Sequence, residues 1–129
     1  MNANHKTVLV VDDEQTLRFA LAAKLQNAGF DVVMASNGDE GLRQALTHKP
    51  DMLLVDILMP VMDGFEMLEA LRKDTWGKSA NVIVLSNQGG NQQIAQAVID
   101  GAYGYMIKSD CKMEDIINEV SERLAHNSL

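Results

Sequence analysis

Hydrophobic residues along this chain follow two alternating patterns. Short continuous apolar runs occur at residues 8–11, 32–34, 52–55 and 82–85, and a weaker run with an internal glycine at 103–107. Runs of this length are typical of strands that are buried on both faces of a sheet. The pattern therefore predicts five strands, all far shorter than the roughly 20 apolar residues of a membrane-spanning helix.

Between these runs, apolar residues recur at every third or fourth position. This spacing indicates amphipathic helices around residues 17–28, 42–46, 65–71, 94–102 and 113–124. Gly29 follows the first of these segments as a helix stop signal. The last segment has the clearest apolar stripe, with acidic residues on its opposite face.

The strand–helix alternation repeats five times. Parallel strands need crossover connections, so alternation of this kind predicts a parallel sheet covered by helices on both faces. Five units in 129 residues are too few to close an eight-stranded barrel. We expect an α/β fold with an open, doubly wound, five-stranded parallel sheet, in which ligands bind at the carboxyl ends of the strands.

Polar residues follow four of the predicted strands. Asp12 and Asp13 follow the first strand, Asp56 the third, Ser86 the fourth and Lys108 the fifth. Taken singly, each has an ordinary structural explanation as a helix cap, a turn residue or a solvated strand end. Their convergence on one edge of the sheet is what favours a functional site.

These residue types indicate phosphoryl chemistry on a carboxylate. Three neighbouring carboxylates repel one another and stay ionised together only when a cation shares their site. Oxygen ligands without histidine or thiol suit Mg²⁺ rather than zinc. Lys108 supplies a second positive charge, so both cations would offset the charge that develops during phosphoryl transfer. Ser86 can donate a hydrogen bond to a phosphoryl oxygen.

With these residues in place, the sequence resembles the response-regulator receiver domains of two-component signalling, the CheY-like family, over about residues 6–125. The resemblance rests on Val10-Val11-Asp12-Asp13-Glu14, on Asp56-Ile57-Leu58-Met59-Pro60-Val61-Met62-Asp63-Gly64, and on Ser86 and Lys108. It implies a flavodoxin-like (βα)5 fold with strand order 2-1-3-4-5. It also implies that residues 1–129 form a single receiver domain.

The resemblance assigns roles at the acidic edge. It implies that Asp56 is the phosphorylated residue and also a metal ligand. Asp13 would bind Mg²⁺ directly, and Asp12 would act on the metal mainly through water. The backbone carbonyl of Leu58 would be the remaining protein ligand.

Three further residues are implied in phosphoryl stabilisation and switching. Ser86 and Lys108 would bind the phosphoryl oxygens, and Tyr105 occupies the family's aromatic switch position. The alternative for Tyr105 is an ordinary half-buried strand aromatic. Ser109 stands where the family usually has proline, and a cis bond to a non-proline residue costs about 3 kcal/mol. The isomer of the Lys108–Ser109 peptide and the dephosphorylation rate stay open.

The implied function is signalling rather than enzymatic turnover. A sensor histidine kinase or a histidine phosphotransfer protein would donate the phosphoryl group. A protein-binding face made of the fourth helix, fifth strand and fifth helix would then change. The downstream partner is either a separate protein or an output domain of a longer regulator, and a phosphorylation-dependent dimer is a further alternative.

Charge and composition limit the kinds of partner that this chain is expected to bind. The formal net charge of −7 disfavours direct contact with nucleic acid phosphates. The single cysteine excludes an internal disulfide, and the polar amino-terminal segment lacks the apolar core of a signal peptide. We therefore expect a cytoplasmic protein that neither enters membranes nor binds DNA or RNA directly.

Three other functions fit the sequence less well. An aspartyl-phosphate phosphatase of the haloacid-dehalogenase type wants a second acid two residues after its nucleophile, where this chain has Leu58. A flavin or nucleotide binder needs a small, hydroxyl-rich phosphate loop after the first strand, where this chain has Asp12-Asp13-Glu14. A degenerate receiver that only binds partners is disfavoured by the complete set of site residues.

Overall fold

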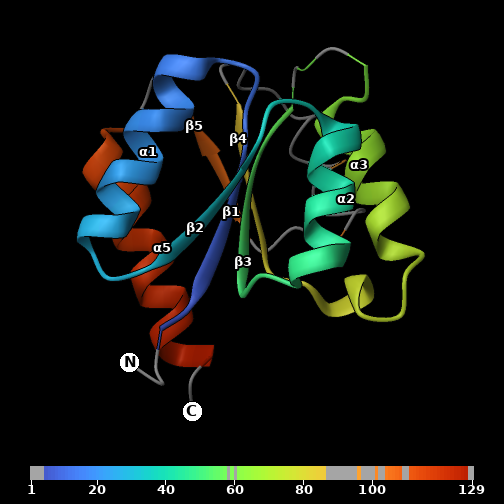
Figure 1. Ribbon diagram of the computed structural model, residues 1–129. Coiled ribbons are helices and arrows are strands. Elements are labelled where there is room, and N and C mark those ends of the chain that lie inside the picture. Colours follow the sequence, from blue (N-terminus) through green and yellow to red (C-terminus); the bar gives the residue numbers. More distant parts are fainter. Residues whose placement is uncertain are drawn as a thin grey trace.

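In the computed structural model, a five-stranded parallel sheet forms the centre of the molecule, in the order β2-β1-β3-β4-β5 (Figure 1). The structure describes residues 5–57, 59, 61–86, 96, 101, 104–108 and 111–127, without the side chains of the last two. The strands are β1 (Thr7–Val11), β2 (Asp31–Ala35), β3 (Met52–Asp56), β4 (Val82–Ser86) and β5 (Gly104–Ile107). The predicted doubly wound α/β fold and its strand order are confirmed.

Helices occupy the connections that the apolar spacing predicted. They are α1 (Gln15–Asn27), α2 (Gly38–His48), α3 (Gly64–Arg72) and α5 (Met113–Asn127), with a short 3-10 turn, η1 (Gly77–Ser79), before β4. The helix predicted at 94–102 lies outside the described residues except for Gln96, which is helical, and Gly101. None of the described helices combines the length and apolarity that a membrane span requires.

Two layers of helices cover the sheet. Helices α1 and α5 lie on one face, and α2 and α3 lie on the other (Figure 1). Each face has its own cluster of buried side chains. The α2/α3-side core includes Leu9, Leu53 and Leu68, and the α1/α5-side core includes Leu25 and Leu54. Both clusters draw on β3, all of whose residues are buried, so its apolar run is continuous rather than alternating.

Local signals explain where the helices begin and end. Gly29 follows the last turn of α1 at φ +99°, and its N–H donates to the carbonyl of Gln26. The N–H of Phe30 donates to the carbonyl of Leu25, which completes a glycine-based helix stop. At α2 the side chain of the N-cap residue Asn37 accepts one of the N–H groups of the first turn, that of Glu40, at 2.8 Å.

The sequence contains one tryptophan, Trp76, which lies in the turn between α3 and η1. Its side chain is half-buried and packs against the α2/α3-side core. Trp76 therefore reports on the packing of that face of the sheet.

Candidate functional site

The register of the sheet brings the predicted site residues to one edge. Val11 of β1 lies opposite Val55 of β3, so Asp12 and Asp56 are the next neighbours along these strands. Asp56 lies opposite Leu85 of β4, which places Ser86 one residue further on. Because parallel strands all end on the same side, these residues meet at the carboxyl edge.

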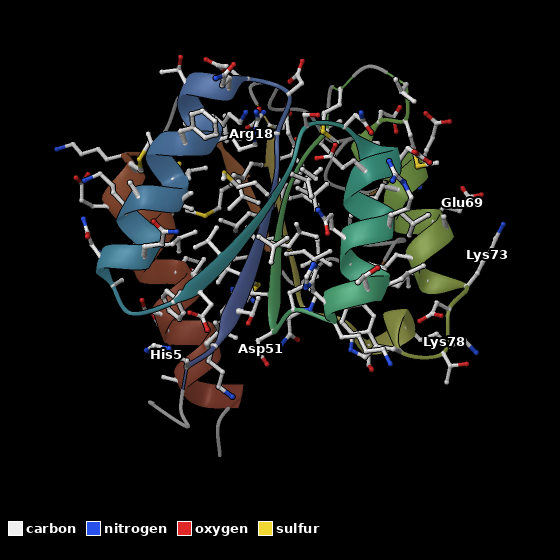
Figure 2. All side chains as sticks on the ribbon, viewed as in Figure 1. His5, Arg18, Asp51, Glu69, Lys73 and Lys78 are labelled. Carbon is white, nitrogen blue, oxygen red and sulfur yellow. The ribbon has the colours of Figure 1, made fainter. Side chains whose placement is uncertain are left out.

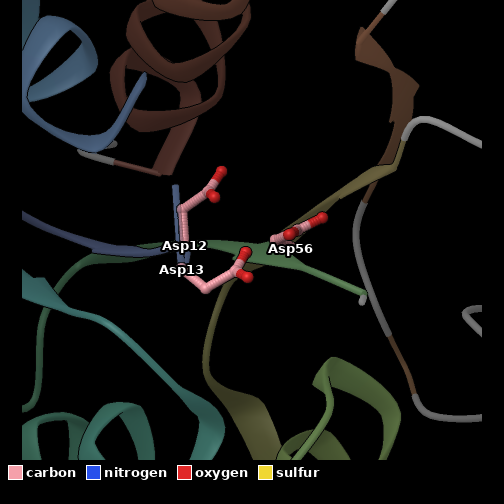
Figure 3. Close-up of side chains that lie close together, drawn as sticks. All are labelled: Asp12, Asp13 and Asp56. Atoms are coloured by element: carbon pink, nitrogen blue, oxygen red, sulfur yellow. The ribbon is translucent and has the colours of Figure 1, made fainter. Parts of the chain in front are cut away.

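The three acids lie together at this edge (Figure 3). One carboxylate oxygen from each of Asp12, Asp13 and Asp56 lies within 4.8 Å of the others. Asp12 is 1% exposed and Asp56 6% exposed, whereas Asp13 lies on the surface. Asp56 closes β3, and the other two follow β1 directly. Two strands therefore supply the whole carboxylate cluster.

Lys108 reaches the cluster from the end of β5. Its Nζ lies 2.7 Å from Oδ2 of Asp12 and 3.5 Å from Oδ1 of Asp56. The lysine side chain is 10% exposed, so these contacts are shielded from solvent. The other oxygen of Asp12, Oδ1, accepts the N–H of Glu14 at 2.9 Å. The Asp12 side chain therefore does not cap α1 but stabilises the turn that leads into this helix.

Burial and the neighbouring acids shift the pKa of Asp56 in one direction, and Lys108 shifts it in the other. Its burial, and then the nearby charges of Asp12 and Asp13, raise the pKa of its carboxyl from 3.8 to about 6, against the lowering influence of Lys108. A carboxyl with this pKa holds its proton more tightly than an exposed one. An added cation would offset the part of this rise in pKa that comes from the charges of Asp12 and Asp13.

Lys108 shows the complementary balance. Burial is the largest single influence and lowers its pKa, but the hydrogen bond to Asp12 and the charges of Asp56 and Asp12 together outweigh it. The net pKa of Lys108 is raised above 10.5, so the amine stays charged at neutral pH. A fixed positive charge thus lies beside the buried carboxylates.

The donor set fits a Mg²⁺ ion. All three ligand groups are carboxylates, and Mg²⁺ prefers a few oxygen ligands at about 2.1 Å while keeping several waters. Two direct ligands on opposite sides of the ion would lie roughly 4 Å apart. Oxygens within 4.8 Å of one another are therefore compatible with two direct ligands and a third that acts through water.

The remaining predicted residues have different positions. Ser86 is buried at the end of β4, next to the strand that carries Asp56. Tyr105 of β5 is half-buried and packs against the α2/α3-side core, which is the packing expected of a strand aromatic. Leu58 and the Lys108–Ser109 peptide lie outside the described residues.

Asp63 and Gly64 belong to the motif that follows β3, but the sequence alone indicated no role for them. Asp63 caps α3: its side chain accepts the N–H of Glu66 at 2.8 Å, and Glu66 accepts the N–H of Asp63 in return. A Cβ on Gly64 would lie 2.4 Å from the carbonyl oxygen of Asp56. Asp63 therefore starts the helix, and Gly64 lets that helix approach the end of β3.

Comparison with known proteins agrees with this geometry. The family profile described as "Response regulator receiver domain" matches residues 8–121, which is most of the chain. The chain belongs to the response-regulator receiver family. PilH from Pseudomonas aeruginosa is 34% identical to this receiver domain over 101 residues, which make up 78% of this chain and 84% of PilH.

Two further comparisons describe the range of relatives. A solved structure of the chemotaxis protein CheY4 from Vibrio cholerae superposes on this receiver domain with a TM-score of 0.85 at 29% identity, covering 92% of this chain and 98% of CheY4. PhoP from Bacillus subtilis, named as an alkaline phosphatase synthesis transcriptional regulatory protein, is 42% identical over 69 residues. That match covers 54% of this chain and 29% of PhoP, so the matched segment spans less than a third of this relative's length.

Proposed function

We propose that this receiver domain accepts a phosphoryl group on Asp56 and passes on a signal through the change that follows. The observation that carries the proposal is the buried Asp56 carboxylate with two acids within 4.8 Å and the Lys108 amine at 3.5 Å. An acceptor in this position can attack a phosphoryl group while fixed charges offset the repulsion between two anions.

The site residues have distinct tasks in this proposal. Asp13 is the direct protein ligand beside Asp56, since its carboxylate is exposed and faces the cluster. Asp12 acts mainly through water, since both of its carboxylate oxygens already accept hydrogen bonds. The carbonyl of Leu58 completes the protein ligands. Bound Mg²⁺ would supply positive charge to the acceptor and to the incoming phosphoryl oxygens.

Lys108 and Ser86 respond to the new group. Once Asp56 is modified, the Lys108 amine would exchange part of its contact with Asp12 for a phosphoryl oxygen, and the Ser86 hydroxyl would donate to another. These rearrangements would favour one conformation of the loop that follows β4 and one rotamer of the Tyr105 ring on β5. The signal is thus a shift between two pre-existing states, driven by their different affinities for the phosphorylated site.

The partners are proposed at the level of the family. Response regulators interact with histidine kinases and with output targets, so a phosphohistidine on a sensor kinase or a phosphotransfer protein is the proposed donor. The proposed reader is a protein surface, on a target or on an output domain, because a net charge of −7 disfavours nucleic acid phosphates. We further propose that the 129 residues act as one receiver domain, without enzymatic turnover of a separate substrate, in the cytoplasm.

The direct test is labelling by acetyl phosphate, with and without Mg²⁺, followed by intact mass. We expect a Mg²⁺-dependent gain of one phosphoryl group, which is lost in Asp56→Asn. The matched control is Asp39→Asn, which removes an exposed acid on α2 that pairs with Arg43 and should label like the wild type. Full labelling of Asp56→Asn would identify a different acceptor and end the proposal.

A further inference from the structure

Arg18 makes a contact with the acidic edge that the assigned roles do not include. It lies in the first turns of α1, near the end of the sheet that carries the acids (Figure 2). Its Nη1 donates a hydrogen bond to the backbone carbonyl of Asp12 at 2.7 Å. The side chain is half-buried, so this charged hydrogen bond is partly shielded from water.

This contact completes the hydrogen bonding of Asp12. The Asp12 N–H donates to the carbonyl of Ala35 at 3.1 Å. Oδ1 accepts from the Glu14 N–H, and Oδ2 accepts from Lys108. With Arg18 on the carbonyl, every polar group of Asp12 has a partner. The carbonyl belongs to the peptide plane that leads into the next residue, Asp13.

Asp13 depends on that plane for its direction. Its carboxylate is exposed, and within the described part of the chain no hydrogen bond or ion pair holds it. Within the described part of the chain, the backbone alone therefore directs the Asp13 carboxylate towards Asp56. A side chain that holds the preceding carbonyl restricts the rotation of this backbone.

A second contact restricts Arg18 itself. The guanidinium carbon lies 5.3 Å from the centre of the Phe19 ring, within the range of a cation–π interaction. Phe19 is 48% exposed. The guanidinium is thus held between a backbone carbonyl and an aromatic ring, which limits the rotamers that an arginine on a helix surface would otherwise sample.

We propose that Arg18 is a positioning residue of the acidic site: by holding the Asp12 carbonyl it directs Asp13 and thereby raises the affinity for Mg²⁺. The inference rests on the proposed function, since it takes Mg²⁺ to be the cation at these acids. Arg18 does not touch the cation. It acts through the backbone of β1 and the turn that follows.

The charge of Arg18 and its positioning role predict opposite changes in Mg²⁺ affinity when Arg18 is removed, so the proposal can be tested by measuring that affinity. A positive group near a cation site repels the cation, so removing it should leave the Mg²⁺ affinity unchanged or increase it. If Arg18 instead positions Asp13, removing it should weaken Mg²⁺ binding. A loss of about 1.4 kcal/mol, the size of a charged hydrogen bond, corresponds to roughly tenfold in affinity.

The experiment measures Mg²⁺ affinity of the full chain by calorimetric titration, together with the shift of the Asp13 amide in NMR spectra. The first variant, Arg18→Met, keeps the length and helix propensity of the side chain but has no hydrogen-bond donor. The second, Arg18→Lys, keeps the positive charge and a single donor nitrogen. The control is Arg43→Met, since Arg43 is an exposed residue of α2 and pairs with Asp39. Unfolding midpoints without Mg²⁺ establish that each variant is folded at the titration temperature.

We expect roughly tenfold weaker Mg²⁺ binding in Arg18→Met, a smaller loss in Arg18→Lys and no weakening in Arg43→Met. Equal or tighter binding in Arg18→Met would overturn the positioning role while leaving the proposed function intact. Equal losses in Arg18→Met and Arg18→Lys would also overturn it, because packing rather than hydrogen bonding would then matter. Absence of Mg²⁺ binding in the wild type would instead contradict the proposed function itself.

Discussion

At the scale of single residues, the conflict at Asp56 connects the fold with the chemistry. Asp56 is 6% exposed and has two acidic neighbours, and among the described residues it is Lys108 that offsets this environment. Its raised pKa means that ionising Asp56 destabilises the metal-free folded state. The fold thus loses stability by keeping this carboxylate, the proposed phosphoryl acceptor, away from water.

The first stability prediction concerns Asp56→Asn without Mg²⁺. A folded-state pKa of about 6, above the ordinary 3.8, favours the protonated form in the folded protein. The stability that Asp56 contributes is therefore fully present below pH 3.8 and is lost as the pH rises through 6. Asparagine has no charge to bury, so the variant should be more stable than the wild type at pH 7.5, by about 3 kcal/mol at most.

Urea unfolding in EDTA at several pH values measures this difference. The advantage of Asp56→Asn should shrink towards zero as the pH falls to about 4. The control Asp39→Asn removes an acid from the first turn of α2 and its pair with Arg43, so it should not gain stability at pH 7.5. An advantage of constant size across the pH range would show that charge burial is not its cause.

At the scale of elements, the site depends on how closely α3 approaches the end of β3. The Gly64 N–H donates to the carbonyl of Ile57 at 2.9 Å, and a Cβ at Gly64 would lie 2.4 Å from the Asp56 carbonyl oxygen. The absence of a side chain therefore allows the helix to begin directly against the end of β3, which carries the proposed acceptor. The position of Asp56 is thus set by the packing of two elements.

Gly64→Ala should harm both stability and function. The methyl group must displace backbone that belongs to Asp56, which should cost about 1–3 kcal/mol in the free energy of unfolding. The rate of labelling by acetyl phosphate should fall as well, because the acceptor moves relative to its neighbours. Urea unfolding and the rate of phosphoryl gain by intact mass measure the two effects.

Gly29→Ala is the matched control for this prediction. Gly29 has φ +99° but no atom within 4 Å of its Cβ position, so alanine there brings backbone strain without a collision. It should cost roughly 1–2 kcal/mol and leave the labelling rate of the folded protein unchanged. If both variants slowed labelling equally, lost stability and not the displaced acceptor strand would explain the effect of Gly64→Ala.

At the scale of the whole molecule, two cores share one sheet. Leu53 and Leu54 are consecutive on β3 and fully buried, but they belong to the α2/α3-side and the α1/α5-side core respectively. Successive side chains of a strand point to opposite faces, so one strand ties the two layers together. This arrangement predicts that the layers unfold together.

Leu53→Ala and Leu54→Ala test this coupling. Each should lower the free energy of unfolding by about 2–5 kcal/mol, because each leaves a cavity in a fully packed region. Trp76 packs only against the α2/α3-side core among the two clusters. Even so, Leu54→Ala should shift the tryptophan-fluorescence midpoint as far as the midpoint from far-ultraviolet circular dichroism. Separate midpoints would mean that the two layers are independent units.

Much of this architecture could be predicted because its signals are local. The five apolar runs became strands within a residue or two of their predicted bounds, since buried parallel strands are apolar along their whole length. The end of α1 at Gly29 could be predicted because the positive φ that ends a helix is favoured by a single residue type, glycine. The strand order and the roles of the site residues came from family resemblance, as periodicity does not encode which strands are neighbours.

The sequence by itself determined which elements form and which chemical groups follow each strand, because these depend on neighbours within a few positions. The tertiary structure alone decided how those groups meet. It placed Lys108 nearer to Asp12 than to Asp56, brought Arg18 to the Asp12 carbonyl, and buried Asp56 enough to raise its pKa. Those contacts depend on strand register and on helix packing between residues up to 96 positions apart, which no local pattern specifies.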